Sequence, residues 1–111
     1  MSYKMMIIDD DEITLDLVQA LMEDDYTIIK MKSGVQALAQ LKEDPDVDVI
    51  LLDMMMPDLD GMKVLSAIKE DKRLSLIPVI LLTSLEGINF EAEGYISGAS
   101  GYVRKPIHAG L

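Results

Sequence analysis

The chain has 111 residues, 50% of them hydrophobic, which is enough for one globular domain with its own core. Its formal net charge of −10 argues against direct contact with nucleic acid, because phosphates repel an acidic surface. The absence of cysteine excludes disulfides and thiolate metal sites, and the lack of a long apolar run or signal peptide predicts a cytoplasmic protein that does not contact a membrane.

The N-terminal part of the chain alternates between strand and helix patterns. The apolar run Tyr3–Ile8 predicts a buried strand, and the β-rich segment Tyr26–Lys32 predicts a second strand at the edge of a sheet. Between them, Glu12–Glu23 is predicted to form a helix that begins after the capping residue Asp11. The apolar residues of this helix recur at helical spacing, which predicts an inward face made of Ile13, Leu17, Val18, Leu21 and Met22.

The middle of the chain contains a second helix and the most apolar strand. Ser33 is a suitable cap for a helix that ends at Glu43–Asp46, where Pro45 disfavours helical conformation in the preceding residue. The inward face of this helix is predicted to contain Val35, Leu38 and Leu41. Val47–Leu52 then predicts a buried central strand that leads directly into a single carboxylate, Asp53.

The last third of the chain continues the alternation. Gly61–Asp71 is predicted to be a helix and Val79–Leu82 a continuous apolar strand. Glu86–Ser97 has a weaker helical pattern because it contains two glycines, and Tyr102–Arg104 predicts a last short strand. The inward side of the helix after Asp60 is predicted to contain Met62, Leu65 and Ile68.

This alternation predicts an α/β fold with a doubly wound, five-stranded parallel sheet of the flavodoxin-like order 2-1-3-4-5. Right-handed crossovers then place the first helix on one face and the next three on the other. A fifth helix is expected after Pro106 to join the first, but the sequence reaches only Leu111. We therefore expect residues 1–111 to form a single domain that lacks its final helix and exposes part of a sheet face, which favours a dimer.

Polar residues follow the predicted strands where each one ends. They are Asp9 and Asp10 after the first strand, Asp53 after the third, Thr83 after the fourth and Lys105 after the fifth. Strands one and three are neighbours in the predicted order, so we expect the three aspartates to share a pocket at the carboxyl edge of the sheet. Two carboxylates about 5 Å apart repel by roughly 3 kcal/mol at an effective dielectric constant near 20. Oxygen ligands favour Mg²⁺ before Ca²⁺ as the ion that relieves this repulsion.

The same set of residues suits phosphoryl transfer. A hydroxyl and an ammonium beside a metal ion can bind phosphoryl oxygens, and the reaction needs mainly positioning and charge neutralisation. An aspartate is a competent nucleophile for this reaction and gives an acyl phosphate. Each residue alone is weak evidence, but together they place an acid pair, an acid, a hydroxyl and a lysine at the ends of different strands.

The sequence resembles the receiver domain of two-component response regulators and hybrid histidine kinases over about residues 3–106. The matching segments are IIDDDE at 7–12, VILLDMMMPDLDG at 49–61, PVILLTS at 78–84 and GASGYVRKP at 98–106. The resemblance implies that Asp53 accepts a phosphoryl group. It also implies that Mg²⁺ is held by Asp9, Asp10, Asp53 and the main-chain carbonyl of Met55.

The resemblance further implies how the phosphoryl group is read. Thr83 and Lys105 would contact its oxygens, and Tyr102 would change rotamer as Thr83 moves. The switching face would comprise strand four, the helix after it and strand five, and the Lys105–Pro106 peptide bond would be cis. The implied partners are a sensor histidine kinase or a histidine phosphotransfer protein, with a C-terminal output domain or a fused kinase as a further possibility. The chain would catalyse only its own phosphorylation and dephosphorylation.

Three other functions remain open from the residues alone. A Mg²⁺-dependent phosphohydrolase with an aspartyl-phosphate intermediate would need a further general acid and a cap, for which the chain has little room. A nucleotide-binding module is disfavoured because no glycine-rich phosphate loop follows the first strand. A receiver-like module that binds partners without phosphorylation would need none of the five polar residues, yet all are present. Structural roles also stay open, with Tyr102 as an edge-strand aromatic and Lys105 as a counterion for the acids.

Overall fold

Five parallel strands form one sheet in the computed structural model, which describes residues 3–56, 60–83, 98–105 and 107. The strand order β2-β1-β3-β4-β5 confirms the predicted flavodoxin-like arrangement, with β2 at one edge. The strands are β1 (Tyr3–Ile8), β2 (Tyr26–Met31), β3 (Val49–Asp53), β4 (Val79–Thr83) and β5 (Gly101–Arg104). The helices in the described residues are α1 (Glu12–Met22), α2 (Gly34–Glu43) and α3 (Gly61–Glu70).

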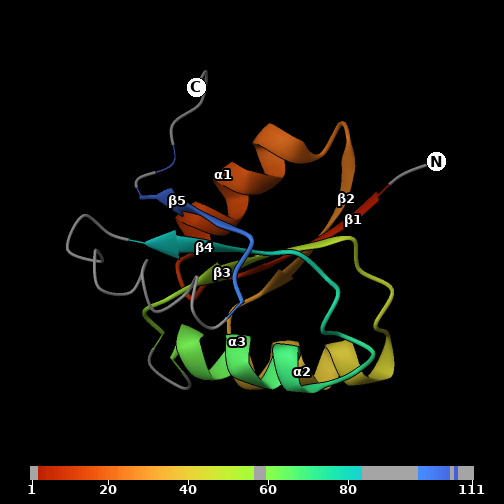
Figure 1. Cartoon of the computed structure of the whole chain (residues 1–111). Helices are drawn as coiled ribbons and strands as arrows, with labels where there is room; N and C mark the ends of the chain where they lie inside the picture. The colour runs from red at the N-terminus through yellow and green to blue at the C-terminus, as the bar shows by residue number, and fades with distance from the viewer. Residues whose placement is uncertain (1–2, 57–59, 84–97, 106, 108–111) are drawn as a thin grey trace.

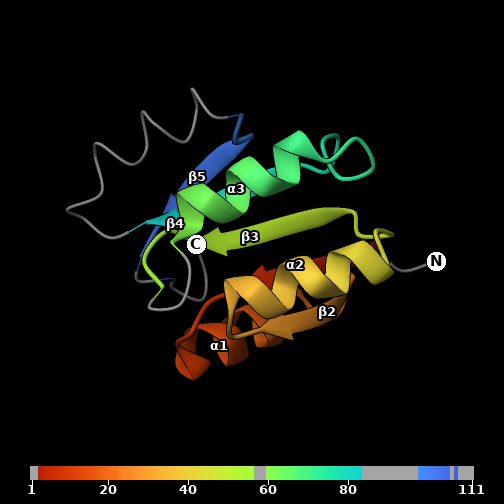
Figure 2. The same cartoon turned by 90° about the horizontal axis from the view of Figure 1, so that it is seen from below.

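The described helices lie on both faces of the sheet, as the crossover rule requires. Among the described helices, α1 is the only one on its face of the sheet, whereas α2 and α3 lie side by side on the other (Figures 1 and 2). This confirms the predicted placement for these three helices. Two predictions concern residues outside the described ranges. They are the helix at Glu86–Ser97 and the cis peptide bond at Lys105–Pro106.

The two apolar layers of the core follow from the alternation of side chains along the strands. On β1, Met6 and Ile8 are fully buried in the larger cluster, which packs against α2 and α3. Their neighbours Met5 and Ile7 belong to the second cluster, which packs against α1 through Leu15. Strand β1 is therefore apolar on both faces and central to both layers, which explains its continuous apolar sequence.

The predicted inward face of α1 is partly wrong. Ile13 is 77% exposed and Leu21 is 39% exposed, while Thr14, Leu15 and Val18 are buried. Apolar residues occupy most of the circumference of this helix, so helical spacing alone allows more than one inward face. Thr14 tolerates burial because its hydroxyl donates a hydrogen bond to Asp11 (3.1 Å to Oδ2).

Helix α2 differs from the prediction at its first turn. Val35 is 58% exposed, and the buried positions are Gly34, Ala37 and Leu41. The positions that face inward at the start of this helix therefore carry smaller side chains than Val35. In α3 the prediction is confirmed, since Leu65 and Ile68 are fully buried and Met62 packs against the same core.

Side-chain caps fix where each described helix begins. The Asp11 carboxylate accepts the Ile13 N–H at 3.0 Å, and the Ser33 hydroxyl accepts the Gln36 N–H at 3.2 Å, which confirms both predicted caps. Asp60 caps α3 in the same way. Strand β3 begins two residues later than predicted and includes Asp53 as its last residue, so the sheet itself holds the backbone of this aspartate.

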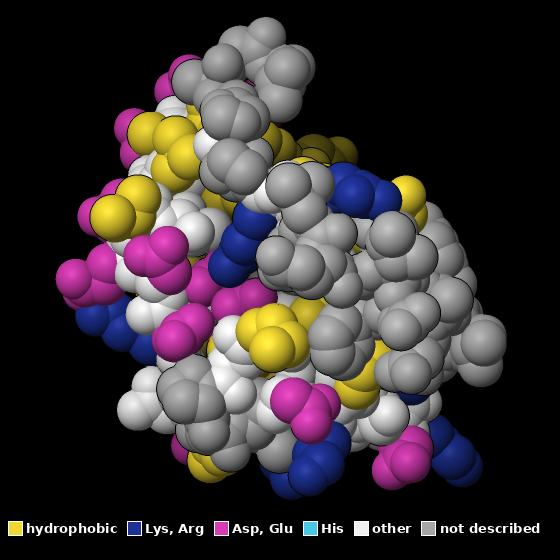
Figure 3. Space-filling view, turned by 90° about the vertical axis from the view of Figure 1, so that its left-hand side faces the viewer, with side chains coloured by type: hydrophobic (Ala, Val, Ile, Leu, Met, Phe, Trp, Pro, Cys, Tyr) yellow, Lys and Arg dark blue, Asp and Glu magenta, His cyan; other side chains and the backbone are white. Residues whose placement is uncertain are grey.

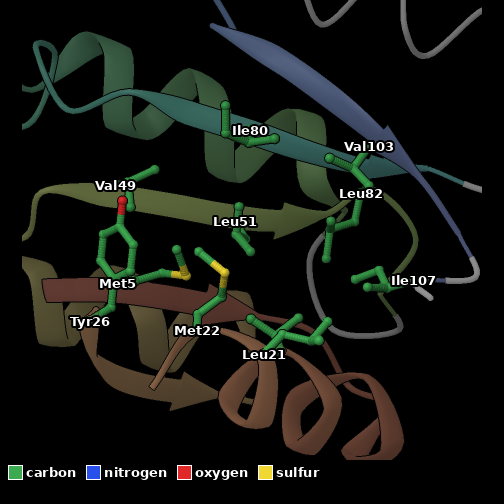
Figure 4. Close-up of a pocket in the computed structure, with 11 residues that line it drawn as sticks. Met5, Leu21, Met22, Tyr26, Val49, Leu51, Ile80, Leu82, Val103 and Ile107 are labelled. Carbon is green, nitrogen blue, oxygen red and sulfur yellow. The ribbon is translucent and has the colours of Figure 1, made fainter. Parts of the chain in front are cut away.

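An apolar groove of about 410 Å³ opens between α1 and the sheet, on the face for which the sequence predicted incomplete cover (Figure 4). Leu21 and Met22 of α1 line one side, and Leu51 and Leu82 of the sheet form its floor. Ile107, the last described residue, also reaches this groove. No described helix is long and apolar enough to cross a membrane.

Candidate functional site

The carboxyl edge of the sheet brings together acidic and basic side chains from three strands. Asp9 directly follows β1, Asp53 ends β3, and Lys105 directly follows β5. The Lys105 Nζ atom lies 2.7 Å from Oδ2 of Asp9 and 3.4 Å from Oδ2 of Asp53. Figure 3 views the molecule from this edge and shows acidic side chains gathered beside a basic one. The predicted convergence is therefore confirmed for these residues.

Backbone N–H groups hold both buried carboxylates. Asp9 is fully buried, and its Oδ1 accepts the Asp11 N–H at 2.9 Å. Asp53 is 4% exposed, and its Oδ1 accepts the Met55 N–H at 3.1 Å. The backbone N–H of Asp9 in turn donates to the Met31 carbonyl at 2.9 Å. In each carboxylate one oxygen is fixed by the chain that follows it, and the other is directed toward Lys105.

Thr83 and Lys105 complete the edge of the site. Thr83 is the last residue of β4, and its carbonyl accepts the Lys105 N–H at 2.6 Å, which ties the end of β5 to β4. Its hydroxyl is buried and accepts or donates no hydrogen bond within the described part of the chain. A buried hydroxyl without a partner is costly in a structural role and is suited to a ligand that arrives later.

Three aspartates offer a set of ligands for a hard cation. Oxygen atoms of Asp9, Asp10 and Asp53 all lie within 4.8 Å of one another, and Asp10 is exposed to solvent. The Oδ2 atom of Asp9 is buried and, among the described residues, accepts no well-directed hydrogen bond despite the nearby ammonium. Carboxylate oxygens with one side open to water fit Mg²⁺, which retains several waters when bound to protein. The residues present therefore fit this ion.

Burial and the neighbouring charges shift two pKa values at the site. Burial raises the pKa of Asp53 from 3.8 to about 6, and the charge of Asp9 adds to this, while the Met55 N–H and Lys105 oppose it. For Lys105, burial alone would lower the pKa, but contacts with Asp9 and Asp53 outweigh burial and raise it. At neutral pH Asp53 is therefore mainly a carboxylate and Lys105 an ammonium.

Two further predicted residues lie near this edge. Met55 exposes 61% of its surface, and its peptide is held beside the Asp53 carboxylate by the N–H contact described above. Tyr102 is 38% exposed on β5, in register with Leu81 of β4. The metal contact of the Met55 carbonyl and the rotamer change of Tyr102 stay predictions.

Gly61 is a positioning residue that the sequence marked only as a turn. A Cβ atom at this position would lie 2.6 Å from the Asp53 carbonyl oxygen and 2.7 Å from the Cα of Met54. Its N–H donates to the Met54 carbonyl at 3.1 Å, so the start of α3 packs directly against the end of β3. Only glycine permits this approach without a shift of the backbone that carries Asp53. The Asp-Gly pair signals the turn, but nothing in the sequence signals the contact.

Comparison with known proteins gives consistent matches over nearly the whole chain. A family model described as response regulator receiver domain matches residues 5–110. Response regulator PleD of Caulobacter vibrioides is 39% identical over 108 residues, which cover 96% of this chain and 24% of PleD. The polar-differentiation response regulator DivK of Brucella abortus is 33% identical over 108 residues, which cover 96% of this chain and 87% of DivK.

Solved structures agree with these relatives. The crystal structure of a response regulator receiver domain protein from Clostridium thermocellum matches with a TM-score of 0.88 and 31% identity, over 96% of this chain and 85% of that one. The chain spans about a quarter of the length of PleD and most of the length of DivK. The similarity thus concerns one domain that occurs in proteins of different length.

Proposed function

This chain belongs to the response regulator receiver domain family of two-component signalling, and on that basis we propose that Asp53 accepts a phosphoryl group from a phosphohistidine. The observation that carries the proposal is the Asp53 carboxylate itself. It is almost fully buried at the end of β3, with one oxygen fixed by the Met55 N–H and the other 3.4 Å from an ammonium. Its orientation is therefore set before any donor arrives, which lowers the entropic cost of the reaction.

In the proposed reaction a carboxylate oxygen of Asp53 attacks phosphorus, and the bond between phosphorus and the donor's imidazole nitrogen breaks. The imidazole leaves with the bonding electron pair, and an acyl phosphate remains on Asp53. The Lys105 ammonium and the Thr83 hydroxyl supply a charge and a donor for the phosphoryl oxygens. Both groups are supported by their position, since Lys105 contacts the carboxylate and the Thr83 hydroxyl is buried without another described partner.

Receiver domains bind Mg²⁺ at an acidic cluster, and the aspartates grouped here match that cluster. We assign the ion to Asp9, Asp10, Asp53 and the main-chain carbonyl of Met55. When bound, it would neutralise the negative charge that the phosphoryl group brings to a site already rich in carboxylates.

The proposed output is a change at β4 and β5. Thr83 and Tyr102 lie on these neighbouring strands, and the Lys105 N–H bonds to the Thr83 carbonyl, so a movement of Thr83 reaches β5 directly. Phosphorylation adds charge and acceptor oxygens at one end of these strands and so favours one of two packings of Thr83 and Tyr102. The chain would then act as a switch that modifies itself and turns over no external substrate.

Receiver domains work with histidine kinases or phosphotransfer proteins, and often with output domains. For this chain we propose a phosphohistidine on a sensor kinase or a phosphotransfer protein as the donor. The output partner is either a domain in the same polypeptide, as the length of PleD suggests, or a separate protein, as the length of DivK suggests.

The test is the intact mass of the chain after incubation with Mg²⁺ and acetyl phosphate. Wild type should gain one phosphoryl group that hydroxylamine removes, because an acyl phosphate reacts with this nucleophile. Asp53→Asn should gain none, whereas Asp46→Asn, which removes a carboxylate whose side chain is 84% exposed, should behave as wild type. Labelling of Asp53→Asn at the wild-type level would overturn the assignment.

A further inference from the structure

The contacts of Lys105 divide the oxygens of the two buried carboxylates into two classes. Backbone N–H groups bind Oδ1 of Asp9 and Oδ1 of Asp53. Lys105 faces Oδ2 of Asp9 at 2.7 Å and Oδ2 of Asp53 at 3.4 Å. The ammonium therefore occupies the side of both carboxylates that the backbone leaves open, which is also the side available to an added cation.

The position of this ammonium is built into the sheet. Lys105 directly follows β5, and its N–H donates to the Thr83 carbonyl at 2.6 Å, so the base of the side chain is held by β4. The side chain is only 25% exposed, against 0% for Asp9 and 6% for Asp53. The ion pairs are thus shielded from water and salt far more than a surface pair, and a cation must compete with them directly.

We propose that Lys105 is an internal counterion that competes with Mg²⁺ for Asp9 and Asp53 and thereby weakens the affinity of the metal-free domain for this ion. The inference rests on the metal site proposed above. Two positive charges close together in a largely buried site repel each other, so Mg²⁺ would either displace the ammonium from the Oδ2 atoms or bind beside it with lower affinity. In either case the three aspartates bind the ion less tightly than they would without Lys105.

The competition would also favour contact between Lys105 and an arriving phosphoryl group. An ammonium that no longer contacts the carboxylates would be available to bind phosphoryl oxygens. Binding of the ion and binding of the phosphoryl group would then support each other through a single side chain.

The test is calorimetric titration of the full chain with MgCl₂ at an ionic strength of about 0.15 M. Lys105→Met, which keeps the length of the side chain and removes its charge, should bind Mg²⁺ about tenfold more tightly than wild type. Lys4→Met is the matched control, because Lys4 is a partly exposed lysine near Asp44 and Asp46 at 3.7 Å, and it should stay within about twofold of wild type.

Equal or weaker Mg²⁺ binding by folded Lys105→Met, with measurable binding by wild type, would overturn the competition while leaving the proposed metal site intact. If Lys105→Met does not fold, Lys105→Gln gives the same comparison, with the fold checked by circular dichroism. Absence of Mg²⁺ binding in wild type and in every Lys105 variant would be a different result, because it would overturn the metal site and this inference together. Binding by Lys105→Met alone would support the competition in its strongest form.

Discussion

The Lys105 ammonium lies 2.7 Å from the Asp9 carboxylate, although β5 and β1 are separated in the sheet by β3 and β4. The side chain of Lys105 reaches past the end of β4 and contacts Asp53 on the way. This contact links the last described strand of the fold to the first. It also gives the acidic site one positive charge against three carboxylates, so the site keeps a net negative charge for a metal ion.

Mg²⁺ should stabilise the folded chain. A ligand that binds only the folded state adds RT ln(1 + [L]/Kd), which is about 1.4 kcal/mol at ten times Kd. Thermal unfolding followed by circular dichroism, with and without MgCl₂, measures this effect. Asp9→Asn should lose most of it, and the surface variant Asp46→Asn should retain it. An unchanged melting temperature of wild type at saturating Mg²⁺ would argue against the acidic pocket.

Without metal, Asp53 should destabilise the fold as pH rises. Burial raises its pKa from 3.8 to about 6, so in the folded state the carboxyl group stays protonated up to a higher pH than in the unfolded state. The contribution of this group to stability is therefore greatest at low pH and is lost as pH rises between those two values. The free energy of unfolding of Asp53→Asn should be similar to that of wild type near pH 4. Above pH 6 it should be higher by up to about 3 kcal/mol, since one pKa unit corresponds to about 1.4 kcal/mol.

Urea unfolding of both proteins in EDTA across this pH range provides the measurement. The informative quantity is the difference in unfolding free energy between Asp53→Asn and wild type at each pH, because the contributions of groups that do not interact with Asp53 cancel in it. A difference that stays constant between about pH 4 and pH 8 would contradict the raised pKa.

Gly61→Ala should displace the backbone that carries Asp53. The added methyl would meet the Asp53 carbonyl oxygen at 2.6 Å, so we expect a loss of about 2 kcal/mol and slower phosphoryl uptake. Gly101→Ala is the control, because among the described residues a Cβ atom there meets only Ile80 Cδ1 at 3.6 Å, an ordinary contact. Urea unfolding and intact mass report the two effects, and equal behaviour of the two alanine variants would reject the role of Gly61.

Thr83→Val should separate stability from signalling. It replaces a buried hydroxyl that has no described partner with a methyl group of similar size, so stability should rise by about 1 kcal/mol. Phosphorylation should still occur on Asp53, but NMR shifts that reach Tyr102 on β5 should be much smaller than in wild type. Thr83→Ser retains the hydroxyl and should preserve the shifts. NMR shift changes of wild-type size in Thr83→Val would show that the hydroxyl does not transmit phosphorylation to β5.

The apolar groove beside α1 predicts that the 111-residue chain associates with itself at high concentration. Val103 lines the groove and is 43% exposed, so Val103→Glu should weaken the association. Leu76→Glu changes a residue that is 90% exposed and outside the groove, and it should leave the association unchanged. Sedimentation equilibrium distinguishes these cases, and a wild-type monomer at the highest concentration would show that this face needs no second copy.

The order of the sheet and the convergence of the strand-end aspartates at one edge could be predicted because they depend on local patterns and on one topological rule. Short apolar runs ending in polar residues marked the strands, and right-handed crossovers placed β1 beside β3. Asp9 and Asp53 then had to meet, since each lies at the carboxyl end of its strand. The caps Asp11 and Ser33 were equally local, because a cap acts within one turn of its own helix.

The inward faces of α1 and α2 could not be predicted fully. Ile13 and Val35 carry the apolar side chains that helical spacing favours, yet both are exposed, and Thr14 and Ala37 are buried instead. Spacing identifies sets of residues that share a face, but how closely a helix approaches the sheet decides which set fits. That distance depends on side chains from several strands at once.

The sequence by itself therefore determined the strand order and the five polar residues at the strand ends, since both follow from periodicity and chain direction. Only the tertiary structure decided which carboxylate oxygens face Lys105, why residue 61 has to be glycine, and which side of α1 is buried. These features depend on distances of a few ångströms between segments far apart in the chain. Such distances are set by close packing of the whole core, which no local pattern encodes.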